Sequence, residues 1–125
     1  MRAKQEPGRN VIHMKIPVDS QRFTAFIEEH HLFDKTKDHL ITFLKNFYMQ
    51  KPEEFEEMLY ADADKVIHSY DFVNEGVSLS KSFFYDPPMD YISVWIRIYD
   101  NENDYLAEYT AFYDAELKFI EDRLK

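Results

Sequence analysis

Apolar side chains in the first half of the chain recur every three to four residues, which is the spacing of one face of an α-helix. A first helix is predicted to begin at Asp19 or Ser20 and a second at Asp34 or Thr36, because these residue types cap helix N-termini. Pro52 opens a third, shorter helix, since proline is favoured in the first helical turn. The predicted apolar faces are, in chain order, Phe23, Phe26, Ile27 and His30; Leu40, Phe43, Leu44, Phe47 and Tyr48; and Phe55, Met58 and Leu59.

After Asp64 apolar and polar residues alternate, which predicts β-strands. A turn over residues 74–76 separates the first strand from a second over residues 77–85, which Asp-Pro-Pro at 86–88 ends. The clearest strand spans residues 91–99. The apolar positions of the first strand are Val66, His68, Tyr70 and Phe72, and those of the clearest one are Ile92, Val94, Ile96 and Ile98.

Residues 105–125 fit two interpretations. As strands they form a hairpin with a turn over residues 114–117, which extends an antiparallel meander. As a helix they present an apolar stripe made of Leu106, Tyr109, Tyr113, Leu117, Ile120 and Leu124. Tyrosine, threonine and phenylalanine crowd the first half of this segment, and these residue types favour the hairpin.

The N-terminal residues 1–10 are polar and predict a flexible tail, whereas the alternation over residues 11–16 predicts a short strand. The other predicted elements are helices in the N-terminal part of the chain and mainly strands in the C-terminal part. The sequence therefore predicts one α+β domain over residues 11–125, with N-terminal helices packed on one antiparallel sheet of four or five strands in meander order.

Composition excludes several classes of protein. The chain has 125 residues, 45% of them apolar, which is enough for one folded core. It has no cysteine, and its two glycines, Gly8 and Gly76, cannot form a phosphate-binding loop. It lacks the G-x-S-x-G motif of serine hydrolases, a membrane-spanning apolar run and a signal peptide. We therefore expect a cytoplasmic protein that has no cofactor and is not an enzyme.

One group of histidines and carboxylates could in principle bind a metal ion. Its members are His30, His31 and His39 with Glu28, Asp34 and Asp38. The spacing lacks the i, i+4 histidine pair that places two imidazoles on one helical face. A structural role is preferred, and no metal is expected.

The net charge of −9 is unevenly distributed. Residues 1–52 sum to +3, whereas residues 53–125 sum to −12. The negative charge of residues 53–125 repels nucleic acid and anionic lipid and attracts basic surfaces. The sequence therefore predicts a basic protein as partner, and neither nucleic acid nor a membrane.

The strand at residues 91–99 carries a second set of large side chains opposite its apolar face. Tyrosine, tryptophan and arginine dominate the energetics of protein–protein interfaces. The following turn is acidic. The candidate partner-binding residues are Tyr91, Trp95, Arg97, Tyr99, Asp100, Glu102 and Asp104. Another part of the chain could cover this face, since large apolar faces of monomers are usually covered.

Two stretches resemble the NTF2-like family, whose helices and curved antiparallel sheet form a cone around a pocket. Residues 43–72 (FLKNFYMQKPEEFEEMLYADADKVIHSYDF) are similar to the helix, acidic turn and first long strand of those proteins. Residues 107–125 (AEYTAFYDAELKFIEDRLK) are similar to their closing hairpin. Only residues 73–76 stand where the family has a helix before the meander, and Glu116 or Leu117 stands where it often has a glycine.

Three interpretations of function follow. The preferred one is a small inhibitor of a basic protein, such as an immunity protein against a toxin or nuclease, or an anti-defence factor. The second is a cone-shaped pocket protein that binds or converts a small apolar ligand, with His68, Lys81 and Tyr85 near the cavity. The third is a structural or regulatory homodimer that associates through the aromatic strand face.

Overall fold

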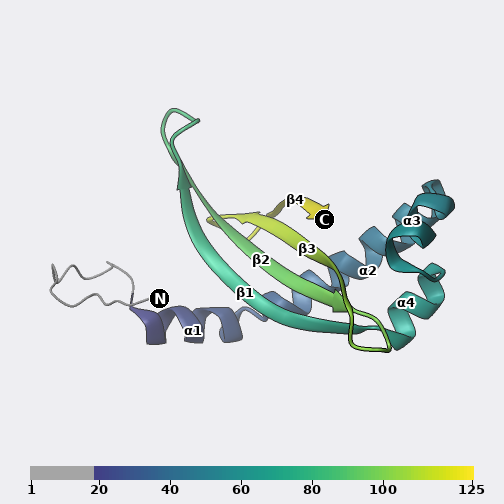
Figure 1. Cartoon of the computed structure of the whole chain (residues 1–125). Coiled ribbons are helices and arrows are strands. Elements are labelled where there is room, and N and C mark those ends of the chain that lie inside the picture. Colours follow the sequence, from purple (N-terminus) through teal and green to yellow (C-terminus); the bar gives the residue numbers. More distant parts are fainter. Residues whose placement is uncertain (1–18) are drawn as a thin grey trace, which may run out of the picture.

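Helices lie on one side of a curved antiparallel sheet (Figure 1). The structure is a computed structural model, and it describes residues 19–125. Within these residues four helices precede four strands, and the sheet order β1-β2-β3-β4 is that of a meander. This confirms the predicted α+β fold class. The predicted strand at residues 11–16 and the tail at 1–10 lie outside the described residues. The elements are α1 (Ser20–Glu29), α2 (Leu32–Gln50), α3 (Pro52–Leu59), α4 (Ala63–Ser69), β1 (Asp71–Ser82), β2 (Met89–Tyr99), β3 (Tyr105–Asp114) and β4 (Phe119–Leu124).

The beginnings of α1 and α3 were correctly predicted. Asp19 caps α1, because its carboxylate accepts hydrogen bonds from the backbone N–H groups of Gln21 and Arg22 at 3.0 and 3.1 Å. Pro52 is the first residue of α3.

The predicted start of α2 at Asp34 or Thr36 is wrong. The helix begins at Leu32, after His31 in a left-handed conformation with φ of 53°. Leu32 is fully buried, so starting the helix there places an apolar anchor in the core. Thr36 lies inside the helix, where its hydroxyl is bonded to the carbonyl of Leu32 and the phenol of Tyr113.

The strand predicted around Val66 and His68 is also wrong, because residues 63–69 form α4. The carboxylate of Asp62 accepts a hydrogen bond from the backbone N–H of Lys65 at 2.9 Å and so caps the helix. Ala63 and Val66, one turn apart, are buried. Of the alternating positions read from the sequence here, Val66 is buried whereas the side chain of His68 is 73% exposed.

The turn predicted over residues 74–76 is a bulge inside β1. Asn74 pairs with Ile96 and Gly76 with Trp95, so that Glu75 is the extra residue. β1 then continues to Ser82, short of the predicted end at Tyr85. The loop that follows contains the predicted break at residues 86–88.

The rest of the sheet agrees with the sequence pattern. The alternate residues Ile92, Val94, Ile96 and Ile98 of β2 are buried, as predicted. Residues 105–125 form the β3–β4 hairpin and not a helix. Its turn is closed by Asp114, whose carboxylate accepts hydrogen bonds from the N–H groups of Glu116 and Lys118 at 2.8 and 2.9 Å.

The core lies between the sheet and the helices. The helices α2 and α3 contact strands β2 and β3, and we call the face of the sheet that they contact the inner face. Apolar side chains of α4 belong to the same core cluster. The buried inner-face residues of β3 are Ala107, Tyr109, Ala111 and Tyr113. No helix within residues 19–125 is long and apolar enough to cross a membrane.

Candidate functional site

The opposite face of the sheet, which we call the outer face, gathers the predicted aromatic residues. Because strand residues alternate between faces, the buried isoleucines of β2 direct its odd-numbered residues outward. Register then adds residues from neighbouring strands, since Tyr99 pairs with Tyr105. Among residues 19–125 no element packs over this face. The outer-face aromatic residues are Tyr91, Trp95 and Tyr99 of β2 and Tyr105 and Phe112 of β3.

The indole of Trp95 packs closely against the glycine opposite it. A Cβ atom added to Gly76 would lie 2.7 Å from Cε2 and 3.0 Å from Cη2 of the Trp95 indole. No side chain other than hydrogen therefore fits at residue 76 while the indole keeps this position. The indole lies across the bulge of β1 and remains partly exposed.

Arg97 is the centre of a polar cluster at one end of the outer face. Its Nε donates to a carboxylate oxygen of Glu75, the bulge residue, and its guanidinium carbon lies 5.1 Å from the centre of the Tyr105 ring. Hydrogen bonds with Tyr99 and Glu75 raise the pKa of Arg97, so this side chain stays cationic. It is nevertheless 40% exposed and can contact a partner.

The other end of the outer face carries a second arginine–aromatic contact. The guanidinium carbon of Arg123 lies 4.8 Å from the centre of the Phe112 ring, and its Nη2 lies 3.4 Å from Glu121. Tyr91 packs beside Phe112 with ring centres 6.2 Å apart. These side chains border a hollow of about 210 Å³, whose described lining residues are Ser82, Tyr85, Met89, Tyr91, Phe112, Ile120, Glu121 and Arg123.

The three predicted acidic residues of the β2–β3 turn have different roles. The carboxylate of Asp100 accepts hydrogen bonds from the N–H groups of Glu102 and Asp104 at 2.9 and 3.0 Å, so it holds the turn together. Glu102 and Asp104 are exposed, and within residues 19–125 their carboxylates make no ion pair. Asp100 is therefore a structural residue beside the candidate interface.

Acidic residues outnumber basic ones across the outer face and this turn. The basic residues are Arg97, Arg123 and Lys125, and the first two are paired with glutamates. The acidic residues are Asp71, Glu75, Glu108, Asp114 and Glu121 on the strands, with Asp100, Glu102 and Asp104 in the turn.

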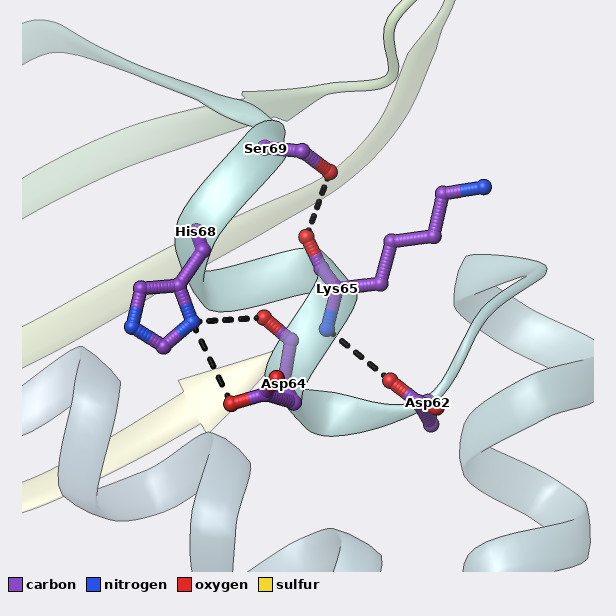
Figure 2. Close-up of polar contacts among 5 residues, drawn as sticks. All are labelled: Asp62, Asp64, Lys65, His68 and Ser69. Atoms are coloured by element: carbon purple, nitrogen blue, oxygen red, sulfur yellow. Dashed lines mark hydrogen bonds and ion pairs between the residues drawn. The ribbon is translucent and has the colours of Figure 1, made fainter.

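The structure does not bring His68, Lys81 and Tyr85 together. Figure 2 shows His68 on α4, where its Nδ1 lies 2.9 Å from the carbonyl oxygen of Asp64 and 3.2 Å from its carboxylate. The Nζ of Lys81 donates to Asp90 at 2.7 Å near the far end of β1, and Tyr85 lies in the loop beyond. The reason is that residues 63–69 fold as a helix before β1, so the whole strand separates His68 from the other two (Figure 1). His68 lines a hollow with Asp62 and Asp64, and neither Lys81 nor Tyr85 is among the described residues that line it.

Sequence reasoning missed a groove on the other side of the molecule, between α2, α3 and β4. It measures about 540 Å³. The rings of His39 and Phe119 stack there with centres 4.2 Å apart, although they are far apart in sequence. The sequence indicates this groove only in part. The apolar stripe of α2 contains more residues than the sheet buries, and some of the remaining ones line the groove. The groove is lined by His39, Thr42, Phe43, Asn46, Phe47, Gln50, Lys51, Glu54, Met58, Phe119, Asp122 and Leu124.

Asp122 of this groove is tied to the core. The phenol of Tyr109 donates to its Oδ2 at 2.7 Å. Burial and, to a lesser extent, this hydrogen bond raise the pKa of Tyr109. Burial likewise raises the pKa of Tyr113 and outweighs the opposite effect of its hydrogen bond with Thr36. Tyr109 therefore remains a hydrogen-bond donor to Asp122 at neutral pH.

No group of three or more histidine, aspartate or glutamate side chains within residues 19–125 is arranged to hold a metal ion. The histidines considered for such a site are distributed over the end of α1, the start of α2 and the groove.

No family model, curated protein or solved structure matches the chain.

Proposed function

We propose that the protein is an acidic protein-binding module whose outer face binds a basic protein and inhibits it. The observation that carries the proposal is the arrangement of Trp95 and Arg97 side by side on β2, on a face over which nothing in residues 19–125 packs. Tryptophan, tyrosine and arginine are the residue types that supply most of the binding free energy of interfaces.

Preorganisation supports this role for the outer face. Trp95 lies against Gly76, and Arg97 is fixed by Glu75 and Tyr105, so little side-chain entropy remains to be lost on binding. Arginine already fixed over an aromatic ring also keeps its outer surface available to a partner. These contacts give the interface two ordered anchors.

Charge supports a basic partner. The acidic residues around the anchors give a negative potential that accelerates the approach of a cationic surface and repels an acidic one. A nuclease or toxin that binds a polyanion presents such a cationic surface. A protein bound there would block the polyanion, which is the physical basis of inhibition in this proposal.

The same charge argues against the outer face as a homodimer interface. Two copies would bring together two faces of the same negative sign, which costs free energy unless the charges are paired. Light scattering of the full chain is therefore expected to give a monomer mass. The NTF2-like pocket interpretation receives no comparable support, because its proposed residues line no common cavity.

The test is capture of a partner by the full chain, followed by measurements on the purified pair. The double variant Trp95→Ala/Arg97→Ala is expected to weaken binding at least about 100-fold, since it removes both anchors. Arg22→Ala is the matched control, because it removes an exposed arginine from α1 on the helical side. Affinity is expected to fall as salt is raised.

The proposal fails if the double variant and Arg22→Ala bind the partner equally. It also fails if the captured protein is acidic, or if binding is insensitive to salt. An activity assay of the captured protein then tests inhibition separately from binding.

A further inference from the structure

The edge of the sheet at β4 carries unpaired backbone groups beside an apolar groove. Within residues 19–125 β4 pairs with β3 on one side and with no strand on the other. The backbone groups on the free side follow from the register. Glu108 and Lys125 exchange two hydrogen bonds of 2.9 Å, so Lys125 is bonded toward β3. In an antiparallel pair the bonded residues alternate, so the N–H and C=O groups of Asp122 and Leu124 point toward the free side.

The groove lies on the same side of β4 as the side chains of these two residues. Asp122 and Leu124 both line it, together with apolar side chains of the two helices. A strand added to this edge would therefore have alternate side chains directed at the groove. The apolar side chains that meet them are Phe43, Phe47, Met58, Phe119 and Leu124.

The charge around the groove favours a basic occupant. Asp122 uses one carboxylate oxygen to accept from Tyr109, which leaves the other oxygen available. Glu54 is a second acidic lining residue, and the remaining glutamates of α3 lie beside it. Among the described lining residues Lys51 is the one lysine or arginine, and its Nζ lies 3.8 Å from Glu54.

We infer that β4 and this groove bind an extended basic peptide segment of another protein by strand addition. The segment pairs with the backbone of Asp122 and Leu124. On its groove-facing side a lysine or arginine lies opposite Asp122, and an aliphatic side chain two residues away lies against Phe43 and Phe47. The site is on the far side of the sheet from the outer face, so it is independent of the proposed function.

The test uses the full chain and a display library of random peptides of about eight residues, which is an ordinary strand length. Enriched peptides are expected to carry a basic and an aliphatic residue two positions apart. No enrichment over the Asp122→Lys variant, which reverses the charge at the edge, would overturn the inference.

A synthetic copy of an enriched peptide then tests the binding mode. Methylation of the peptide's alternate backbone nitrogens keeps every side chain and removes the donors needed for pairing, so affinity is expected to fall about tenfold or more. NMR spectra of the full chain are expected to show shifted amides at Asp122 and Leu124. Equal binding of the methylated peptide, or shifts confined to Trp95 and its neighbours, would contradict strand addition at β4.

Matched protein variants test the charge. Asp122→Asn keeps an oxygen that accepts from Tyr109 but loses the negative charge, and it is expected to lower the affinity about fivefold. Asp34→Asn removes an exposed carboxylate of α2 that does not line the groove, and no change is expected. Equal affinities in both variants would refute the role of Asp122. Because Asp122 is not on the outer face, failure here leaves capture through Trp95 and Arg97 untouched.

Discussion

Gly76 lies directly beneath the indole of Trp95, so that residue 76 has no room for a side chain. We therefore expect Gly76→Ala to lower the free energy of unfolding by about 1–3 kcal/mol through overpacking. Ser78→Ala, two residues along the same face of β1, is the control and is expected to change it little. Urea denaturation of both variants measures the difference. Equal stability would mean that the indole moves aside at no cost.

Thr36 and Tyr113 form a buried pair of hydroxyl groups at 2.8 Å. Thr36→Val keeps the shape of the side chain but leaves the Tyr113 phenol without this partner, which is expected to cost about 1–3 kcal/mol of stability. The hydroxyl of Thr36 also donates to the carbonyl oxygen four residues earlier. Thr24 makes that same bond at an exposed position of α1. Thr24→Val is therefore the matched control, and a loss as large as that of Thr36→Val would show that the buried pair is not the cause.

The buried tyrosines predict a loss of stability in alkali. Tyr109 and Tyr113 have raised pKa values in the folded protein. Above pH ~10 the unfolded chain releases these protons while the folded chain retains them, so the free energy of unfolding falls as pH rises. The fall continues until pH passes the folded pKa, and below pH ~10 this contribution is fully present.

Tyr113→Phe tests that pH dependence. Each such tyrosine contributes a slope of at most about 1.4 kcal/mol per pH unit, and the variant is expected to lose one such contribution. Urea midpoints measured from pH 8 to 11 give the slope. Tyr60→Phe, at an exposed tyrosine, is the control. A slope that is the same for the wild type and both variants would contradict the assignment.

The side-chain cap at the N-terminus of α4 can be removed by substitution. Asp62→Ala is expected to lower stability by about 1 kcal/mol, because the N–H of Lys65 loses its acceptor. Asp62→Ser retains a side-chain oxygen and is expected to recover most of the loss. If alanine and serine destabilise equally, the carboxylate acts through its charge and not as a cap.

The sequence was sufficient for the parts of the fold where local pattern and burial agree. The alternation of β2 is an example. Its buried isoleucines and valine stand at every second position, so the residues between them are predicted to lie on the outer face. It failed at α4, where Val66 and His68 alternate like a strand although Ala63 and Val66 are what the core buries. It also failed at Thr36, whose capping preference was overridden by a hydroxyl partner 77 residues away.

The candidate site was predictable to the same extent. Trp95 and Arg97 follow from the period of one strand, whereas the partners that hold them, Gly76 and Glu75, depend on a register that the sequence does not reveal. The groove depends on three elements from both halves of the chain. Such a site is a property of tertiary packing, and no local pattern predicts it.

The bulge at Glu75 has a consequence for how this protein tolerates insertions and deletions. Before the bulge the even-numbered residues Phe72 and Asn74 lie on the inner face, whereas after it the odd-numbered residues Val77 and Leu79 do. The bulge therefore changes which alternate residues of β1 face inward. Deleting Glu75 would restore an unbroken ladder and leave every core residue of β1 facing inward. A one-residue deletion near the middle of either half of the strand would turn the rest of that half over. Length variation in β1 should therefore be tolerated at this one position, at the cost of the carboxylate that holds Arg97.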